Sequence, residues 1–344
     1  MVSLATDSPF PGNGVEAPLP SVSIMIVCMN NMGNLRPCLE SIRNQTKGTT
    51  YETLVVAYLF SRENLSAAKA EFPWATFIES NEIRGFSENN NLALRQARGK
   101  YCFVLNDDTV VRMDAAGRLA KTLEELGEGA AIVSPLIRRG DGSIQYRGKG
   151  PRGAREWFLD TLHLGRFGRD RTAGRTEGKE VFRTFNICGA AFLIRTDVFR
   201  KMGGFDERYF FCPEDIALSS GVNGMGCGVW VDTRAEVIHL EGMSGKSASS
   251  TLAATRPAGR EGALIFYPGE RRWLRRLMRI HSFLATIPQF LVHWTKGRLG
   301  KRPNTDSVLA EGDWNILRTT FSGMTPKEMF IACQGGVPRE KRKK

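Results

Sequence analysis

The chain has 344 residues, of which 42% are apolar and 24% charged, an ordinary globular composition that excludes disorder throughout. Its formal charge of +12 is unevenly placed. Residues 256–344 carry 18 basic and 7 acidic side chains, a net +11, whereas residues 1–255 carry 30 and 29, a net +1. An anionic partner is therefore expected at the C-terminal part rather than at the nearly neutral body.

The cysteines and the N-terminal residues indicate the cellular compartment in which the protein is expected. Seven cysteines form no close pair and are odd in number, which indicates neither a zinc site nor a complete disulfide framework and favours the cytoplasm. Residues 1–20 lack the pattern of a signal peptide and are predicted to be a flexible leader. With no run of about 18 apolar residues, no transmembrane helix is predicted.

Strands and helices alternate through the first third of the chain. Apolar strands are predicted at 21–29, 51–60, 75–80 and 100–105, with helical patterns at 35–45 and 87–99 between them. This alternation predicts an α/β fold with a mainly parallel sheet flanked by helices, and in such sheets ligands bind beyond the carboxyl ends of the strands.

The middle of the chain is less regular. Residues 138–184 are rich in Gly and Arg and weakly periodic, so we predict a long loop or excursion over the active face. A strand and a helix follow at 185–203, and a last strand over 228–240 brings His239 to its end. A boundary near residue 256 separates the domain at 21–255 from a basic amphipathic helical extension at 256–335 and a disordered basic tail at 336–344.

Acidic and amide side chains end the strand at 100–105. Asn106, Asp107 and Asp108 project at the carboxyl edge of the predicted sheet, where oxygen ligands suit Mg²⁺ or Mn²⁺ bound together with a substrate phosphate. Asn and Asp are equally usual in turns and helix N-caps, so this alternative stays open. His239 could converge on the same edge, although a lone His at a strand end is more often structural.

Glu214 and Asp215 open a predicted helix after Pro213. One interpretation is structural, because carboxylates at the start of a helix are stabilised by capping and by the helix dipole. The other is a general base that deprotonates an acceptor hydroxyl.

Four segments in this order, at 21–31, 85–109, 188–215 and 236–247, resemble family 2 glycosyltransferases of the bacterial rhamnosyltransferase-like kind, which have a GT-A fold. The resemblance covers about two thirds of the chain. It implies inverting transfer of a sugar from a nucleotide-diphosphate donor, with dTDP-rhamnose or a UDP-sugar favoured, to a glycan or polyprenyl-linked acceptor in cell-surface polysaccharide synthesis. A catalytically weak relative that binds nucleotide sugar or glycan is the alternative.

The resemblance also implies roles for individual residues. Asp215 corresponds to the catalytic base, with Glu214 beside it, and Asp108 and His239 correspond to the ligands of a divalent metal. It also implies that Gly189 and Ala190 lie on the acceptor side of the site. The donor-binding residues that it implies lie at four places in the sequence: Cys28 and Asn30, Tyr58, Gly85 with Phe86, Asn90 and Asn91, and Asn106 with Asp107.

Two positions depart from the family pattern. Ala57-Tyr58 stands where many relatives have Asp-Asn, so Tyr58 is a candidate to stack on the donor base, and recognition of the base by the loop at Asn30 is the alternative. Ala217 stands where the family's Glu-Asp-x-Asp-Leu pattern has its second Asp, which leaves Asp215 as the expected base.

The C-terminal part combines Arg and Lys with Trp and Leu between residues 270 and 302. This composition predicts an amphipathic helix on an anionic membrane surface, and a helix packed on the catalytic domain is the alternative. We expect no nucleic-acid partner, because the body has no basic stripe and no recognised motif. The expected location is cytoplasmic, peripheral on the inner face of the cytoplasmic membrane.

Overall fold

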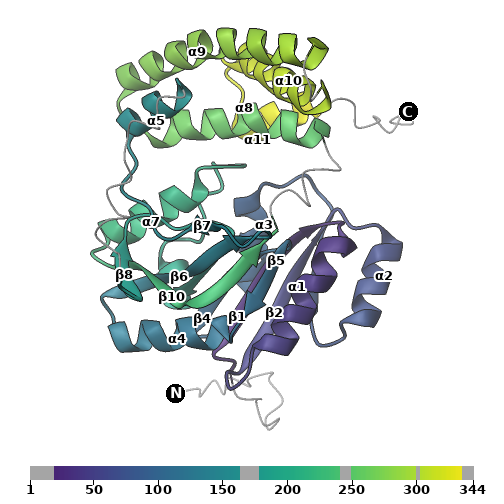
Figure 1. Ribbon diagram of the computed structural model, residues 1–344, viewed down its shortest axis with the longest axis vertical. Helices are drawn as coiled ribbons and strands as arrows, with labels where there is room; N and C mark the ends of the chain where they lie inside the picture. The colour runs from purple at the N-terminus through teal and green to yellow at the C-terminus, as the bar shows by residue number, and fades with distance from the viewer. Residues whose placement is uncertain (1–18, 163–177, 241–248, 300–302, 335–344) are drawn as a thin grey trace, which may run out of the picture.

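The computed structural model describes residues 19–162, 178–240, 249–299 and 303–334 (Figure 1). In Figure 1 a sheet flanked by helices lies below a separate layer of helices. The ten strands of the described residues form one sheet, in which eight follow the order β3-β2-β1-β4-β9-β6-β10-β5, while β7 pairs with β6 and β8 with β10.

The first half of the sheet is parallel, as the alternating pattern predicts. Strands that follow one another in the chain are joined by helices here, and the neighbouring pairs β3–β2, β2–β1 and β1–β4 are all parallel. The elements are β1 (Val22–Met29), α1 (Met32–Gln45), β2 (Tyr51–Tyr58), α2 (Arg62–Glu71), β3 (Thr76–Ser80), α3 (Phe86–Gln96) and β4 (Tyr101–Asn106).

The second half of the sheet combines parallel and antiparallel strand pairs. Between β4 and β6, strand β9 runs antiparallel to both, while β10 runs parallel to β6 and antiparallel to β5. The predicted α/β sheet is thus confirmed, with most of its parallel pairing in the first half. The elements are β5 (Thr109–Arg112), α4 (Ala115–Leu126), β6 (Ala130–Arg139), β9 (Ala191–Arg195), α6 (Thr196–Lys201), α7 (Glu214–Gly224) and β10 (Gly228–His239).

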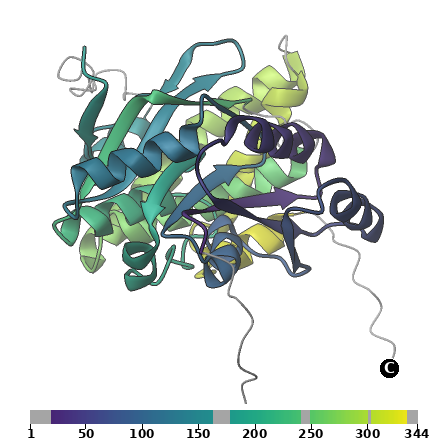
Figure 2. The same cartoon turned by 90° about the horizontal axis from the view of Figure 1, so that it is seen from below.

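Helices cover both faces of the sheet (Figure 2). Leu39 of α1 and Leu119 of α4 belong to one buried cluster with the side chains of β1 and β4. Phe199 of α6 and Val222 of α7 belong to a second cluster on the other face, together with α3. Burial on both faces explains why these strands read as continuous apolar runs.

The segment 138–184 is more ordered than its weak periodicity suggests. It contains β7 (Ile144–Tyr146), α5 (Ala154–Thr161) and β8 (Val181–Thr184), and residues 163–177 lie outside the described residues. Both strands are short and pair with β6 or β10. Strands of three or four residues take their order from backbone pairing with a neighbour, which leaves little hydrophobic periodicity in the sequence.

The C-terminal helices form a layer above the sheet, which we call the helical layer: α8 (Ser249–Phe266), α9 (Arg272–Leu299), α10 (Pro303–Thr319) and α11 (Pro326–Cys333). It begins at Ser249, slightly before the predicted boundary near residue 256. Helix α5 joins it, because Trp157 packs against Leu264, Leu274 and Met278. The predicted extension is therefore packed helix over its described residues, whereas residues 336–344 lie outside them.

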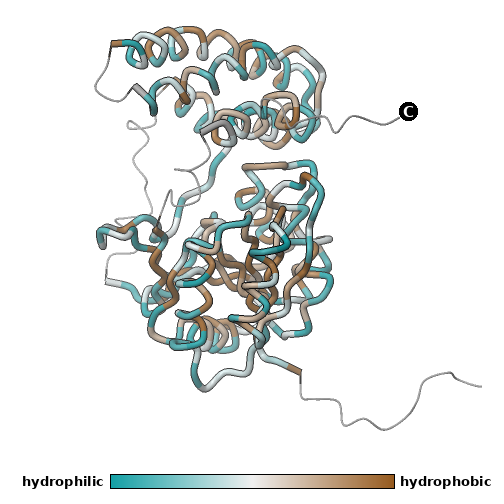
Figure 3. The backbone as a smooth tube through the Cα atoms, turned by 90° about the vertical axis from the view of Figure 1, so that its right-hand side faces the viewer, coloured by the Kyte–Doolittle hydropathy of each residue, from teal (hydrophilic) through white to brown (hydrophobic). Residues whose placement is uncertain are grey.

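The helical layer contacts the sheet unit beside α7. A Cβ on Gly262 of α8 would lie 2.3 Å from the carbonyl oxygen of Cys212, so the helix approaches that backbone as closely as glycine allows. Phe330 of α11 packs on Phe210, with ring centroids 4.5 Å apart. The apolar residues concentrate in the sheet, whereas the helical layer alternates in hydropathy (Figure 3). Among the described helices, none combines the length and apolarity needed to cross a membrane.

Candidate active site

Two distant segments meet at the carboxyl edge of β4. Asp107 and Asp108 form the turn between β4 and β5, and the antiparallel register of β5 with β10 sets Thr109 opposite His239. Oδ1 of Asp108 consequently lies 3.1 Å from Nε2 of His239, with both side chains largely buried. The structure therefore brings together the two residues that the sequence predicted as metal ligands.

A third residue holds the imidazole from its other side. Oε1 of Gln145, on β7, lies 2.9 Å from Nδ1 of His239, and Nδ2 of Asn106 lies 3.5 Å from Nε2. Because an amide oxygen accepts hydrogen bonds, this contact favours a proton on Nδ1, the tautomer in which Nε2 could bind a cation together with Asp108. Gln145 was missed in the sequence because it lies in the weakly periodic segment.

The side chains at this edge fit a divalent cation that is shared with substrate. Within the described ranges, no group of three His, Cys, Asp or Glu side chains could hold a metal. One carboxylate and one imidazole suit Mg²⁺ or Mn²⁺, which take one or two protein ligands and complete their shells with water and phosphate oxygens. The donor set therefore fits a metal bound together with a diphosphate.

Asp107 points elsewhere, toward β1. Its side chain interacts with the Cys28 thiol, whose pKa is raised by burial and by the charge of Asp107. Asn30 follows β1 with a φ of 48° and accepts hydrogen bonds at Oδ1 from the backbone N–H of Ser61 and from Nδ2 of Asn64. The ends of β1 and β2 are thereby held together beside Asp107.

The structure argues against Tyr58 as a stacking surface for a base. Its side chain is 7% exposed, and its hydroxyl accepts a hydrogen bond from the backbone N–H of Arg84. A buried ring has no free face for a ligand. Arg84 is the more accessible residue here, and its guanidinium contacts Ser80 and Glu82.

The residues of the motif at Gly85 make close contacts within the chain. A Cβ on Gly85 would lie 2.3 Å from the carbonyl oxygen of Phe210, and Phe86 packs edge-on against Phe205. Asn91 bonds the backbone N–H and C=O of Phe205 at 2.9 Å each. Its neighbour Asn90 is 1% exposed and donates to the carbonyl oxygen of Phe86. Together these residues hold the segment that leads to α7.

Glu214 and Asp215 form the first turn of α7. Glu214 is 7% exposed, and its Oε2 has no hydrogen-bond partner within the described part of the chain. Burial and the charge of Asp215 raise the pKa of Glu214. Burial also raises the pKa of Asp215, against the opposing effects of the Ile216 N–H and of the charge of Lys149. Carboxylates with raised pKa are suited to accept a proton near neutral pH.

Gly189 and Ala190 connect the two groups of acidic residues. The backbone N–H of Asn106 donates to the carbonyl oxygen of Ala190, 3.0 Å away. On the other side, a Cβ on Gly189 would lie 3.7 Å from Cβ of Asp215, and its backbone N–H lowers the pKa of that carboxyl. The segment predicted for the acceptor side therefore lies between the end of β4, which leads to the predicted metal ligand Asp108, and the candidate base.

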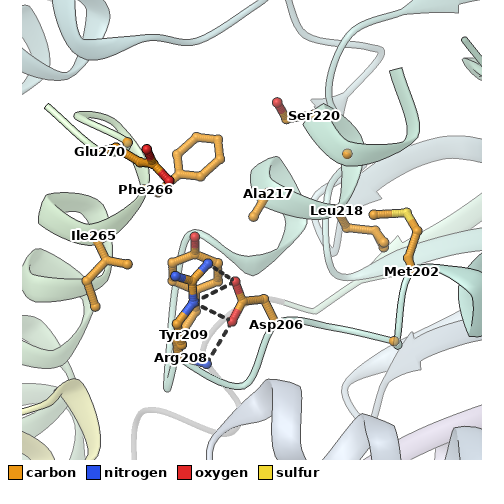
Figure 4. Close-up of a pocket in the computed structure, with 13 residues that line it drawn as sticks. Met202, Asp206, Arg208, Tyr209, Ala217, Leu218, Ser220, Ile265, Phe266 and Glu270 are labelled. Carbon is orange, nitrogen blue, oxygen red and sulfur yellow. Dashed lines mark hydrogen bonds and ion pairs between the residues drawn. The ribbon is translucent and has the colours of Figure 1, made fainter. Parts of the chain in front are cut away.

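A hollow of about 520 Å³ opens beside α7 and is bounded by both the sheet unit and the helical layer. Figure 4 shows the Asp206–Arg208 ion pair, Phe266 and Glu270 around it. Ala217 contributes to its wall, at the position where the resembled family has an acid. Ala217 and Asp215 project from different sides of α7, because residues two apart on a helix do not share a face.

Comparison with known proteins identifies the first part of the chain. The family model described as glycosyl transferase family 2 matches residues 23–203, slightly more than half of the chain. The matched region extends from β1 to the glycines after α6. It includes Asn106–Asp108 and Gly189, whereas α7 and His239 follow it.

Among curated proteins, the O-antigen biosynthesis protein RfbC of Myxococcus xanthus is 25% identical over 236 residues, covering 65% of this chain and 18% of that protein. The N-acetylglucosaminyl-diphospho-decaprenol L-rhamnosyltransferase of Mycobacterium tuberculosis is 40% identical over 70 residues, covering 20% of this chain and 22% of that enzyme. The chain thus spans about a fifth of the length of these relatives.

Two solved structures share the architecture. GalNAc-T7 with UDP, GalNAc and Mn²⁺ has a TM-score of 0.53 at 17% identity, over 77% of this chain and 55% of that chain. The mannosyltransferase PcManGT of Pyrobaculum calidifontis with GDP-Man and Mn²⁺ has a TM-score of 0.50 at 15% identity, over 93% and 90%. These likenesses support the GT-A fold, and with the family match they show that the chain belongs to glycosyl transferase family 2.

Proposed function

We propose that this glycosyltransferase transfers a sugar, with inversion, from a nucleotide-diphosphate donor to a hydroxyl group of a glycan or lipid-linked acceptor. The observation that carries the proposal is the arrangement at the sheet edge. Asp108 and His239 lie on one side of the Gly189–Ala190 segment and Asp215 on the other. This arrangement supports a diphosphate site and a base on opposite sides of the reacting hydroxyl.

Asp108 and His239 are the residues that would hold a divalent cation with the donor diphosphate. Such a cation supplies Lewis-acid stabilisation of the leaving group. Asp215 accepts the proton of the acceptor hydroxyl, and the resulting oxygen nucleophile attacks the anomeric carbon from the face opposite the diphosphate. A single displacement of this kind inverts the configuration at that carbon.

Among donors, we favour dTDP-rhamnose or a UDP-sugar. The two relatives named for O-antigen biosynthesis and for rhamnosyl transfer support a donor and an acceptor used in cell-surface polysaccharide synthesis. The hollow beside α7 opens on a different side of this helix from Asp215, so it suits a part of an extended acceptor that lies away from the reacting hydroxyl. Its mixed lining of Phe266, Asp206 and Arg208 suits the apolar faces and hydroxyl groups of a sugar.

We also propose that the enzyme works in the cytoplasm at the inner face of the cytoplasmic membrane. The net charge of +11 on residues 256–344 supports this location, since the cytoplasmic leaflet is anionic.

A screen of UDP-, GDP- and dTDP-sugars by thermal shift, with and without Mn²⁺, tests the proposed donor. A cognate donor at 100 times its Kd should stabilise the fold by about 2.7 kcal/mol. The shift should require the metal and should disappear in Asp108→Asn, whereas Asp141→Asn, in an exposed turn, is the matched control. If none of the sugar nucleotides changed the melting temperature, the proposal would be contradicted.

A binding protein without turnover is the second candidate, favoured by Ala217 at the position of the family's second acid. Metal-dependent hydrolysis of the stabilising donor, followed as release of the nucleoside diphosphate, separates the two. Hydrolysis supports the enzyme, and binding without product over many hours supports the second candidate.

A further inference from the structure

The outward face of α9 is apolar along its whole length. Its side chains recur at alternating spacings of four and three residues, so they form one stripe on the helix. The stripe, which we call the α9 stripe, consists of Trp273 (63% exposed), Leu277 (49%), Ile280 (50%), Leu284 (59%), Ile287 (38%), Leu291 (54%) and Trp294 (44%).

The inward face of the same helix is apolar at its start, where Leu274 and Met278 are buried, and polar farther along. Ser282 and Thr286 are fully buried there, and Gln289 donates to the carbonyl oxygen of Thr161. His293 pairs with Asp313 of α10, 2.6 Å away. A helix that folds only against its own protein has its apolar face inward and a polar face outward. The α9 stripe therefore has the character of a contact surface for a partner.

The charged side chains of α9 itself are all positive, although Glu311 of α10 lies near Trp294. Helix α9 contains six basic residues and no acidic residue. Arg275 and Arg279 pair with Glu261 of α8. Arg272, Arg276 and Lys296 are exposed, and none of them forms an ion pair with a described carboxylate. These side chains can meet anionic groups at the edge of the stripe.

Apolar surface continues next to the C-terminal end of the stripe. Trp314 of α10 is 54% exposed and packs near Phe290, with ring centroids 5.8 Å apart. A hollow of about 300 Å³ opens between these rings and Trp294, and the Arg298 guanidinium lies 4.3 Å from the centroid of the Trp294 ring. Tryptophan and arginine side by side are typical of helices at the lipid headgroup level.

We infer that α9 docks flat on an anionic phospholipid bilayer through the α9 stripe, with its arginines at the headgroups. The inference rests on the proposed membrane location and specifies the surface that would be responsible. The complete absence of acidic residues on α9, with basic residues at both ends of the stripe, favours an anionic lipid surface over a second copy of this chain. A second copy would bring the same arginines together.

Vesicle flotation with full-length protein tests this inference. Vesicles of phosphatidylcholine with 30% phosphatidylglycerol are compared with pure phosphatidylcholine, and the variant Leu277→Gln/Leu284→Gln/Leu291→Gln is compared with the natural protein. Binding to the anionic vesicles should fall by roughly tenfold or more in this variant. Arg272→Gln should weaken binding to the anionic vesicles about fivefold and leave the weak binding to pure phosphatidylcholine unchanged.

The matched control is Met113→Gln/Leu252→Gln/Ile331→Gln, which removes three similarly exposed apolar side chains outside the stripe. It should bind vesicles as the natural protein does. Equal binding by both triple variants would overturn the inference. So would a dimer in light scattering that dissociates only in the stripe variant, because a second copy would then cover this face.

The donor-dependent thermal shift is measured on the same variants. It should stay unchanged in the stripe variant, because the stripe is remote from Asp108 and His239. If no donor raised the melting temperature of the natural protein or of any variant, the proposed function would be contradicted. If only the difference in vesicle binding between the two triple variants were absent, the docking surface would be contradicted.

Discussion

Gln145 holds the ring of His239 from the side opposite Asp108 and the proposed metal position, with Oε1 2.9 Å from Nδ1. The contact joins β7, in the weakly periodic segment, to the end of β10. Residues that orient a metal-binding imidazole in this way typically change metal affinity by 10- to 100-fold when removed.

We therefore expect Gln145→Ala to weaken Mn²⁺ binding by about 10- to 100-fold. Gln145→Glu should retain most of the affinity, because a carboxylate also accepts the Nδ1 hydrogen. Titration of the free protein with Mn²⁺, followed by electron paramagnetic resonance, measures this without turnover. Gln96→Ala, at an exposed position on α3, is the control, and equal affinities for Gln145→Ala and Gln96→Ala would refute the role.

Asp215→Asn should lower turnover by about 10² to 10⁴, because the amide cannot accept the acceptor proton. Donor binding should persist, since this side chain lies on the other side of the Gly189–Ala190 segment from Asp108. Product formation and donor-dependent thermal shift are measured in parallel. Turnover close to that of the natural enzyme on the true acceptor would exclude Asp215 as the base.

Glu214→Gln should stabilise the protein at alkaline pH. Burial and the charge of Asp215 raise the pKa of Glu214 in the folded state, so ionisation there opposes folding. This destabilisation is absent below the unfolded pKa of about 4.3, grows as the pH rises from there to the folded pKa of about 8, and is constant above it.

The difference in melting temperature between Glu214→Gln and the natural protein should accordingly be near zero at pH 4 and a few degrees positive at pH 8.5. The exposed Glu128→Gln serves as control. A difference that does not vary with pH would show that burial of the Glu214 charge carries no cost.

Gly262→Ala should destabilise the protein by about 1–3 kcal/mol, because its Cβ would lie 2.3 Å from the carbonyl oxygen of Cys212. Gly224→Ala in α7 is the comparison, since no heavy atom lies within 4 Å of its added Cβ. Urea unfolding measures both. Equal stabilities would mean that α8 can move away from the loop before Glu214 at little cost.

The sequence predicted those parts of the fold that depend on periodicity along the chain. Strands β1 and β4 are nearly continuous apolar runs and β10 is apolar in two short stretches, and the polar residues that end β4 and β10 mark the edge where Asp108 meets His239. This meeting could be anticipated because strand ends gather at one edge of an α/β sheet.

Roles that depend on pairing across the chain were harder to predict. Asn91 and Tyr58 are residue types that suit a ligand site, yet the structure uses them to bond the backbone of Phe205 and Arg84. An amide that binds a substrate and an amide that holds a loop are identical in sequence. Gln145 is the opposite case, because it contacts a candidate site residue although no local sequence pattern marks it. Its partner His239 lies 94 positions away.

The stacking of the helical layer has a consequence for acceptor length. Helix α9 rests on α8 and α10, and α8 contacts the backbone just before Glu214. With α9 in the lipid interface, roughly two helix diameters, or about 20 Å, separate the bilayer from the catalytic turn. The helical layer would then act as a spacer that sets the height above the membrane at which a hydroxyl group is glycosylated, and acceptors would be selected by their reach as well as by their chemistry.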